Sequence, residues 1–538
     1  MRTENTEVLI VGAGPTGLLL ACELARRAVS FRIIDKSPRP SQLSRGLGIH
    51  SRSLEIFEDL GLLSELVDRG FWLTGTSVFT DRTLSKRVPL DETRSESDPF
   101  PSLLIIEQAQ VEQVLTDELN RQGIEVERSC ELKNFAQSEK EVNITLSRHK
   151  LLERLKCRYL IGCDGPKSKV RQNLGIDFVG FTYPKVYTLA EVRMNWNLDP
   201  EMYRFIGADS DLVAIPLGED RFRLTAWENS EQEGGEEADT AHGSLRDAPT
   251  HEHIQALLDK LAPIGSKVAE ARVLLRYKME LKLASSYGRG RCFIAGDACH
   301  VHPPTGAQGL NTGIQDAYNL GWKLASVVRG DCPRELLESY ESERRPIGHW
   351  VLNNTHSAAS SRFEMAGQRF FVLGQKFLMS RWNHLSVNYR ESSIVAQLTP
   401  AGQIGDLQAG DRLPDGVLQS QDKLEESRVF QLLWGTRHHL FVFTGGQYEF
   451  KDAVDKISSD YRKWVEIHVI GGDSEWPTSS LWCDPEGKVA KAYAIQEPTL
   501  LFVRPDGYIG ARAGQDQQET FLSYLENCFR RKVGSVSA

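Results

Sequence analysis

The chain has 538 residues, which predicts about three domains at roughly 100–200 residues each. Hydrophobic residues make up 40% and charged residues 25%, an ordinary globular composition that excludes a disordered, collagen-like or fibrous chain. With 64 Lys and Arg against 73 Asp and Glu, the formal net charge is −9, which disfavours binding to nucleic acid or to an anionic membrane.

The nine cysteines are scattered and form no Cys-x-x-Cys pair, which predicts reduced thiols rather than a disulfide framework or a zinc knuckle. No apolar run approaches the ~18 residues needed to span a bilayer. The polar N-terminus, residues 1–7, lacks the apolar core of a signal peptide. We therefore expect a cytoplasmic protein.

The first motif combines a strand, a glycine turn, a helix, a second strand and an acid. Residues 8–11 form a continuous apolar run, as in a strand buried in a parallel sheet. Residues 12–17 read Gly-Ala-Gly-Pro-Thr-Gly, residues 18–27 are predicted to be helical, and residues 31–34 form a strand that ends at Asp35. This context is typical of a dinucleotide-binding fingerprint.

Each glycine of that fingerprint, and the acid that follows it, has a physical role. Gly12 permits the tight turn, Gly14 lets the backbone approach a pyrophosphate, and Gly17 lets helix and strand pack closely. The N–H groups at the helix start favour phosphate, and Asp35 can accept hydrogen bonds from a ribose. A glycine turn that only packs would leave the acid unexplained. No second such fingerprint follows, and no redox cysteine pair follows the first, which disfavours a separate nicotinamide domain and a disulfide reductase.

Two further strands end in acidic turns. Residues 158–163 lead into Asp164-Gly165 and a predicted helix that opens at 166–171. The alternative to a functional role is a polar turn begun by Asp164 and followed by a helix that Ser168 caps. Residues 291–295 lead into Gly296-Asp297, a Pro-Gly loop and a helix that begins near Leu310, which again forms an anion site at a helix start.

Three residues of that loop invite a metal hypothesis. Cys299, His300 and His302 follow a strand with no matching cluster of ligands elsewhere, whereas zinc needs three or four convergent ligands. We therefore interpret them as loop residues and predict no metal site.

The three motifs in this order resemble those of the flavin-dependent aromatic hydroxylases, the single-component FAD monooxygenases related to p-hydroxybenzoate hydroxylase and phenol hydroxylase. The segments 44–52, 107–112 and 340–346 also match that family, so the resemblance covers roughly residues 5–400.

The resemblance implies a set of cofactor-binding residues. They are Gly12, Gly14 and Gly17 at the FAD pyrophosphate, Asp35 at the adenosine ribose, Arg45 at the diphosphate or ribose, Gln108 and Asp297 at the ribityl chain, Asp164 with Arg171 in a motif tied to FAD and NAD(P)H, and the backbone of Gly309, Leu310 and Asn311 at the pyrimidine edge. It also implies two catalytic positions, Pro303 lining the substrate cavity through its carbonyl and Arg223 near the flavin, although a plain sheet-face arginine is equally compatible with Arg223.

The implied fold is α/β, with a Rossmann-like FAD-binding domain, an inserted antiparallel-sheet substrate domain and a C-terminal thioredoxin-like domain. The expected segments are 1–75, 107–180 and 285–400 for the FAD-binding domain and its connecting helices, 76–106 and 181–284 for the substrate domain, and 401–538 for the thioredoxin-like domain.

In the substrate segment, residues 212–216 and 221–227 are predicted strands. Trp227, Phe205 and Tyr203 are candidates for an aromatic pocket, with core packing favoured for any one of them. The acidic stretch 228–239 is expected to be a mobile loop, with a lid as the alternative.

In the tail, residues 439–443 and 464–470 are predicted strands, 498–512 a hairpin and 517–529 a helix. Its only cysteines, Cys483 and Cys528, are 45 positions apart, so thioredoxin dithiol chemistry is excluded and a structural or oligomerising role is expected.

The resemblance implies a monooxygenase that uses FAD, NAD(P)H and O2 to hydroxylate a phenolic or polycyclic, polyketide-like aromatic through a C4a-hydroperoxyflavin. The cofactor supplies the difficult chemistry, while the protein orients the ring and excludes water. Baeyer–Villiger oxygenation, epoxidation, a flavin-dependent reductase and a non-enzymatic flavoprotein are the alternatives. The expected partner is a small aromatic substrate, without nucleic acid or membrane. The choice of NADH or NADPH, the substrate and a homodimer are left open.

Overall fold

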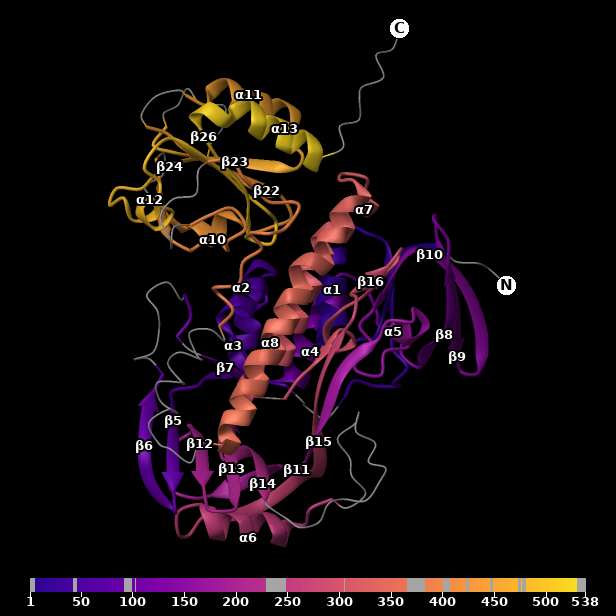
Figure 1. Ribbon diagram of the computed structural model, residues 1–538, viewed down its shortest axis with the longest axis vertical. Helices are drawn as coiled ribbons and strands as arrows, with labels where there is room; N and C mark the ends of the chain where they lie inside the picture. The colour runs from indigo at the N-terminus through magenta and orange to yellow at the C-terminus, as the bar shows by residue number, and fades with distance from the viewer. Residues whose placement is uncertain are drawn as a thin grey trace.

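The computed structural model describes residues 5–41, 46–90, 99–101, 103–228, 248–303, 305–364, 383–399, 407–421, 425–445, 449–472, 476 and 480–529. It is a mixed α/β structure with three large sheets arranged along the longest axis of the molecule (Figure 1).

The first sheet lies in the middle of the molecule. Its order is β16 (Gly288–Arg289), β17 (Cys292–Ile294), β10 (Leu151–Gly162), β1 (Asn5–Val11) and β2 (Phe31–Ile34), and β8 (Cys130–Gln137) and β9 (Val142–Arg148) extend β10 as an antiparallel pair. β17, β10, β1 and β2 are mutually parallel. The apolar run predicted at residues 8–11 is buried as expected. Because parallel strands end at one edge, the turns after them come together there.

Helices cover this sheet and carry its loops. α1 (Pro15–Ala25) packs against α7 (Gln308–Val328) and α4 (Gln108–Arg121), and α8 (Glu338–Glu364) crosses α7. α1 begins with Pro15 at its first position, where the missing N–H costs no hydrogen bond. The shorter helices of this region are α2 (Ser51–Asp59), α3 (Leu63–Arg69), α5 (Lys169–Asn173), η2 (Gly296–Ala298), η3 (Thr305–Ala307) and η4 (Arg334–Leu337).

The second sheet lies at the lower end of Figure 1. Its order is β18 (His300–Val301), β15 (Lys267–Ala284), β11 (Phe178–Asn195), β14 (Arg221–Glu228), β13 (Ser210–Gly218), β12 (Met202–Ile206), β5 (Gly75–Thr80) and β6 (Thr83–Pro89). The prediction of an antiparallel sheet is wrong at one junction, because β12 and β5 pair in parallel. β5 and β12 lie far apart in the chain, so no hairpin sets the direction of their pairing.

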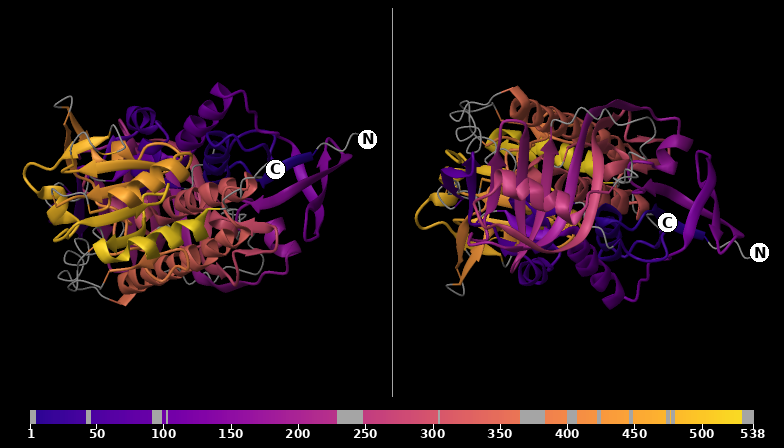
Figure 2. Two further views of the ribbon diagram at one scale, coloured as in Figure 1. Left: turned by 90° about the horizontal axis from the view of Figure 1, so that it is seen from above. Right: turned by 90° about the horizontal axis from the view of Figure 1, so that it is seen from below.

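The two faces of the second sheet differ. α6 (His251–Leu261) covers the outer face, which the view from below shows in front of the strands (Figure 2). A core cluster fills this layer with Phe205, Tyr203, Leu224 and Leu258. A separate small sheet has the order β3 (Leu47–Ile49), β7 (Leu104–Glu107) and β4 (Phe71–Trp72).

The third sheet lies at the upper end of the molecule. Its order is β19 (Ala396–Gln397), β26 (Ile509–Gly514), β25 (Thr499–Val503), β22 (His438–Phe443), β23 (Val465–Ile470), β24 (Leu481–Cys483), β20 (Val417–Ser420) and β21 (Glu426–Arg428). α11 (Lys451–Asp460) and α13 (Gln518–Cys528), preceded by η5 (Gln515–Gln517), cover one face. α10 (Val429–Leu432) and α12 (Lys488–Ala492) cover the other. The strands, hairpin and closing helix predicted in the tail are confirmed to within two residues.

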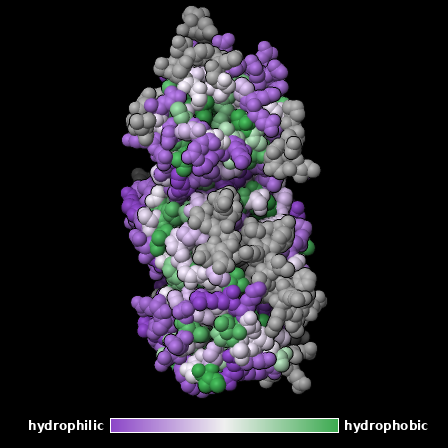
Figure 3. Space-filling view, turned by 90° about the vertical axis from the view of Figure 1, so that its left-hand side faces the viewer, coloured by the Kyte–Doolittle hydropathy of each residue, from purple (hydrophilic) through white to green (hydrophobic). Residues whose placement is uncertain are grey.

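No helix in the described part of the chain combines the length and the apolar character that crossing a membrane requires. Figure 3 shows hydrophobic side chains in small groups among hydrophilic ones on one face of the molecule.

Candidate functional site

The glycine turn after β1 is shaped by close backbone contacts. Gly12 has φ +104°, and a side chain there would overlap the carbonyl of Cys163 at the end of β10. A side chain at Gly17 would overlap the carbonyl oxygen of Gly12. Gly14 differs, because an added Cβ would meet no atom within 4 Å. The chain therefore leaves space above Gly14, at the start of α1.

Asp35 follows β2 at the same edge of the sheet. Its carboxylate accepts hydrogen bonds from the N–H of Ala13 at 2.8 Å and of Ser37 at 2.7 Å. The guanidinium of Arg128 lies 3.8 Å away. The acid is thus held against the glycine turn, and its predicted contact with a ribose stays a prediction.

Three segments meet at Thr16, a residue that sequence reasoning missed. Side chains added at Gly296 or Gly313 would both overlap the hydroxyl of Thr16. The start of α1, the loop after β17 and the first turns of α7 are therefore in close contact. The position of Thr16 between Pro15 and Gly17 of the glycine turn was the sequence signal that could have found it. The predicted residue Asp297 lies on this loop and is exposed.

The start of α7 offers backbone N–H groups. Gly306 and Ala307 have left-handed φ values of +75° and +54°, and the helix begins at Gln308. The N–H groups of the first helical residues, which include Gly309 and Leu310, have no acceptor within the helix. The positive end of the helix dipole lies at the same point. This position favours an electron-rich ligand edge.

Asn311 acts through its side chain. It is fully buried, its Oδ1 accepts from the N–H of His50 at 2.9 Å, and its Nδ2 donates to the carbonyls of Ala307 at 2.7 Å and Gly48 at 3.2 Å. The residue therefore joins β3 to α7. It holds the helix start in place, whereas Gly309 and Leu310 remain the candidates for backbone contacts.

Gln108 lies beside the same helix start. Its Oε1 accepts from the N–H of Gly46 at 3.1 Å, and its own N–H donates to the carbonyl of Gly46 at 3.2 Å. A Cβ at Gly46 would lie 3.2 Å from the Cβ of Leu310. The structure thus brings Gln108 and Leu310 together. Arg45 lies outside the described residues.

Asp164 caps α5. Its Oδ2 accepts from the N–H groups of Lys169 at 2.6 Å and Val170 at 3.2 Å, and Ser168 caps the same helix through Arg171 N–H at 3.0 Å. The buried Oδ1 of Asp164 has no hydrogen-bond partner among the residues that the structure describes. Burial raises the pKa of Asp164. The capped-turn interpretation is confirmed, and the acid also borders the glycine turn.

Arg171 spans two loops. Its guanidinium donates to the carbonyls of Ala298 at 3.0 Å and Pro166 at 2.6 Å, and it lies 3.8 Å from the ring centroid of Phe178. These contacts tie the Asp-Gly turn to the loop that carries Asp297.

The sequence interpretation treated His300 as a loop residue, and the structure shows that this is wrong. It is buried in β18, and its Nε2 lies 2.7 Å from the carboxylate of Asp316 in α7. Asp316 also accepts from the N–H of Gly296 at 3.2 Å and from Arg344 Nε at 2.7 Å. This buried carboxylate connects α7, α8 and the loop after β17. No sequence motif marks Asp316, so sequence reasoning did not find it.

Pro303 is buried, and its carbonyl already has a protein partner. His302 Nδ1 lies 3.0 Å from that oxygen. Burial lowers the pKa of His302 to about 4, so the ring is neutral at pH 7 and its Nδ1–H donates to Pro303. A Cβ at Gly309 would lie 3.6 Å from the imidazole. The predicted catalytic proline therefore lies beside the start of α7.

Arg223 lies on the inner face of the second sheet, opposite to α6. It is buried and paired with Glu191 on the adjacent strand. The strand register places Trp227, Tyr187 and Tyr277 in one row on the same face. This row is four residues from Arg223, about 13 Å along the strand. Aromatic rings and a charged pair thus share the face that looks toward the first sheet.

The other aromatic candidates belong to the core. Tyr203 and Phe205 face α6, so core packing is confirmed for them. Trp227 lies instead on the inner face, where Lys185 Nζ lies 3.9 Å from its ring centroid. Residues 229–239 of the expected acidic loop lie outside the described residues.

These features fit a dinucleotide cofactor. A Cβ added at Gly14 would meet no atom within 4 Å, and the starts of α1 and α7 both provide N–H donors, which favour phosphate. Asp35 supplies an acceptor beside the glycine turn, and Gln108 supplies an amide near Leu310.

Comparison with known proteins agrees with this geometry. The FAD binding domain family matches residues 5–355. A flavin-dependent monooxygenase of Mycobacteroides abscessus is 31% identical over 528 residues, which cover 96% of this chain and 99% of the relative. Pentachlorophenol 4-monooxygenase of Sphingobium chlorophenolicum is 28% identical, with 98% and 97% coverage. Among solved structures, OxyS anhydrotetracycline hydroxylase from Streptomyces rimosus gives a TM-score of 0.75 at 28% identity and covers 98% of this chain and 100% of its own.

Proposed function

This chain belongs to the FAD binding domain family and is a flavin-dependent monooxygenase, and we propose that it hydroxylates a phenolic or polycyclic aromatic substrate. The convergence of three segments at Thr16, beside the open space at Gly14, carries this proposal. The names of two similar proteins, a pentachlorophenol 4-monooxygenase and an anhydrotetracycline hydroxylase, support an aromatic substrate.

The cofactor would be held mainly by backbone groups. We assign the diphosphate to the turn at Gly12, Gly14 and Gly17, and the adenosine ribose to Asp35. Gln108 and Asp297 are assigned to the ribityl chain. Arg45 and Asp164 complete the proposed set. Bound FAD, reduced by NAD(P)H, supplies the oxygen chemistry with O2.

The start of α7 would stabilise the reduced cofactor without a cationic side chain. Gly309 and Leu310 present N–H groups at the positive end of a 21-residue helix. Donors that are fixed before charge develops cost no reorganisation when it does. His302 is neutral at pH 7 and so adds no cation at that point.

The inner face of the second sheet would orient the aromatic substrate. Trp227 and Tyr187 offer flat surfaces for ring packing, which prefers offset or edge contacts. Arg223, already neutralised by Glu191, can donate to an oxygen substituent without placing a net charge beside the ring. Pro303, beside the start of α7, would line the substrate cavity. Together these groups would position the ring and exclude water.

The three sheets support a division into three units. We assign 1–75, 107–180 and 285–400 to the FAD-binding domain, 76–106 and 181–284 to the substrate domain, and 401–538 to a thioredoxin-like domain. In the last unit, parallel β22 and β23 beside antiparallel β25 and β26, with helices on both faces, support the thioredoxin-like assignment. All nine cysteines are free, which supports a reducing, cytoplasmic location. A homodimer stays a prediction.

The test is a panel of phenols and polycyclic polyketides added to the FAD-loaded enzyme. A substrate should accelerate NAD(P)H oxidation, and its product should gain one oxygen atom by mass. Product NMR separates hydroxylation from Baeyer–Villiger oxygenation and epoxidation. NAD(P)H oxidation coupled to substrate reduction without O2 uptake would contradict the proposal and favour a reductase. Purified protein that is colourless and refuses added FAD would contradict the flavin assignment itself.

A further inference from the structure

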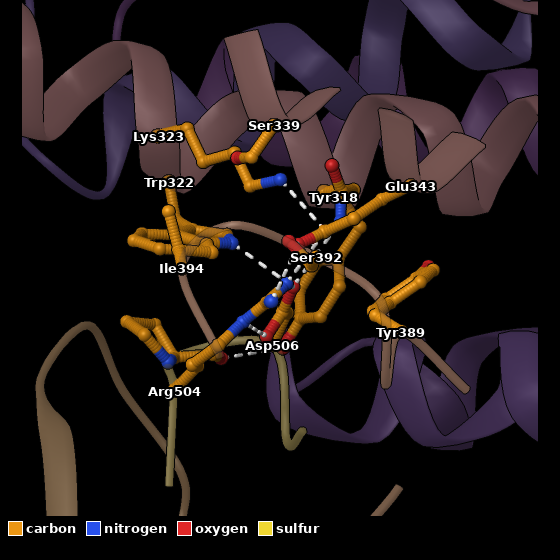
Figure 4. Close-up of polar contacts among 12 residues, drawn as sticks. Tyr318, Trp322, Lys323, Ser339, Glu343, Tyr389, Ser392, Ile394, Arg504 and Asp506 are labelled. Carbon is orange, nitrogen blue, oxygen red and sulfur yellow. Dashed lines mark hydrogen bonds and ion pairs between the residues drawn. The ribbon is translucent and has the colours of Figure 1, made fainter. Parts of the chain in front are cut away.

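The turn between β25 and β26 of the third sheet forms a buried ion pair with α8. Arg504 Nη1 and Nη2 donate to the two carboxylate oxygens of Glu343 in α8 at 2.7 and 2.9 Å. Arg504 also pairs with Asp506 of its own turn at 2.5 and 3.0 Å. The side chains of Arg504, Glu343 and Asp506 are each at most 2% exposed. Figure 4 shows these groups pointing toward one another from two segments, the turn and α8.

The same cluster holds α7. Glu343 accepts from Lys323 Nζ and Asn319 Nδ2, both at 2.7 Å, and Trp322 Nε1 donates to Asp506 at 3.0 Å. Ser392, from the segment that leads to the third sheet, donates to Glu343 at 2.6 Å. One carboxylate thus receives donors from three other segments of the chain, and both of its oxygens are fully used (Figure 4).

The next residue along α8 extends the network to the loop after β17. Arg344 donates to Asp316 at 2.7 Å and to the hydroxyl of Tyr389 at 2.9 Å. Asp316 in turn accepts from the N–H of Gly296. The guanidinium of Arg504 lies 5.3 Å from the ring centroid of Tyr389. A continuous set of contacts therefore runs from the third sheet to the loop beside Asp297.

The charges of this cluster balance. Lys323 and Arg504 are matched by Glu343 and Asp506. Although burial alone would raise the pKa of Glu343, Arg504 and Lys323 hold it well below its ordinary value. Burying ions is costly, and apolar side chains of similar volume often stabilise a fold as well or better. Stability alone is therefore a poor explanation for four buried charges, whereas their directional bonds fix one arrangement of α7 and α8.

We propose that Glu343 is a positioning residue. Through it, Arg504 and Asp506 of the third-sheet unit fix α7 so that the N–H groups of Gly309 and Leu310 are correctly placed to contact the flavin. The inference rests on the proposed flavin site at the start of α7. It gives the C-terminal unit, which lacks paired cysteines, a role in cofactor geometry rather than in thiol exchange.

The test uses the full chain with Glu343→Gln, which keeps the shape of the side chain and removes its charge. FAD is titrated into the apo-protein, and the dissociation constant is read from flavin fluorescence well below the unfolding temperature. The absorbance spectrum of the bound flavin and the ratio of peroxide to hydroxylated product are then measured. Residues in coupling networks change distant equilibria by about 2- to 30-fold, so a dissociation constant raised by that factor, with more peroxide, is expected.

Arg437→Met is the matched control, because it breaks the exposed pair between Arg437 and Glu466 on the same third sheet. It should leave the FAD dissociation constant and the peroxide ratio unchanged. Should Glu343→Gln fail to fold, Arg504→Lys keeps the charge but loses the two-pronged contact, and a smaller change in the same direction is expected.

A lower unfolding temperature with unchanged FAD affinity, spectrum and peroxide ratio in either folded variant would overturn the inference, because a purely structural cluster predicts that result. Wild-type protein that binds no FAD would instead overturn the proposed function. The two failures are therefore distinguishable.

Discussion

Gly14→Ala should separate cofactor binding from folding. Gly14 has φ −81° and ψ −177°, an extended conformation that alanine adopts without strain. Its new methyl group would meet no protein atom within 4 Å. Gly14 is the N-cap of α1, where replacing glycine by alanine costs about 1 kcal/mol or less. The apo-protein should therefore unfold within a few degrees of the wild type.

The same methyl group occupies the space assigned to the diphosphate. A hydrogen bond to a charged group contributes about 1.5–3 kcal/mol, so losing one predicts a dissociation constant for FAD raised by roughly 10- to 100-fold. Losing two would multiply the effect. Titration of apo-protein with FAD, followed by quenching of flavin fluorescence, measures the change, and thermal unfolding of the same apo-protein measures the cost to the fold.

Gly17→Ala is the contrasting variant, because its methyl group would overlap the backbone carbonyl of Gly12. It should lower the unfolding temperature before any FAD is added. Wild-type affinity in Gly14→Ala would refute the placement of the diphosphate. A loss of apo-protein stability in Gly14→Ala as large as that in Gly17→Ala would refute the open space itself.

Three further changes test other parts of the site. Asp297→Ala, at an exposed position, should speed FAD loss on dialysis without altering unfolding, and unchanged flavin content would remove Asp297 from the site. Trp227→Ala should raise the KM for an aromatic substrate by about 2- to 12-fold, the worth of one aromatic contact, at constant FAD affinity; an unchanged KM would assign Trp227 to packing. Burial lowers the pKa of Lys323 to about 8 from 10.5, so between these values the unfolded chain holds more protons. From pH 7 to 10.5 the free energy of unfolding of the wild type should therefore rise by about 3 kcal/mol relative to that of Lys323→Met, measured by urea unfolding, and parallel profiles would contradict the burial of a charged lysine.

Local signals predicted the elements that carry the site. The strand at residues 31–34 has the predicted bounds, because an apolar run between polar turns needs no tertiary information. The helix at Gln308 begins two residues before the predicted Leu310, where a left-handed pair of residues ends the loop. Glycine turns, apolar periodicity and capping residues act within a few positions of the chain, so sequence reasoning reaches them.

Contacts between distant segments were not predictable in the same way. Asp316 lies within an ordinary helical pattern, and only the packed structure brings it to Gly296, His300 and Arg344. The pairing of Arg223 with Glu191 depends on a strand register set across 32 positions. The parallel junction of β5 and β12 likewise pairs two strands that lie far apart in the chain.

The polar side chains that the motifs mark mostly bind this protein's own backbone. Asp35 holds the N–H of Ala13, Asp164 caps α5, Arg171 binds two carbonyls, and Asn311 joins β3 to α7. The N–H donors proposed to face the cofactor lie at helix starts, and their positions depend on those side chains. Substituting such a residue should therefore weaken FAD binding by moving a loop as well as by deleting any direct contact. By the same reasoning, we expect the buried cluster around Glu343, which touches no proposed cofactor contact, to affect FAD binding through the position of α7.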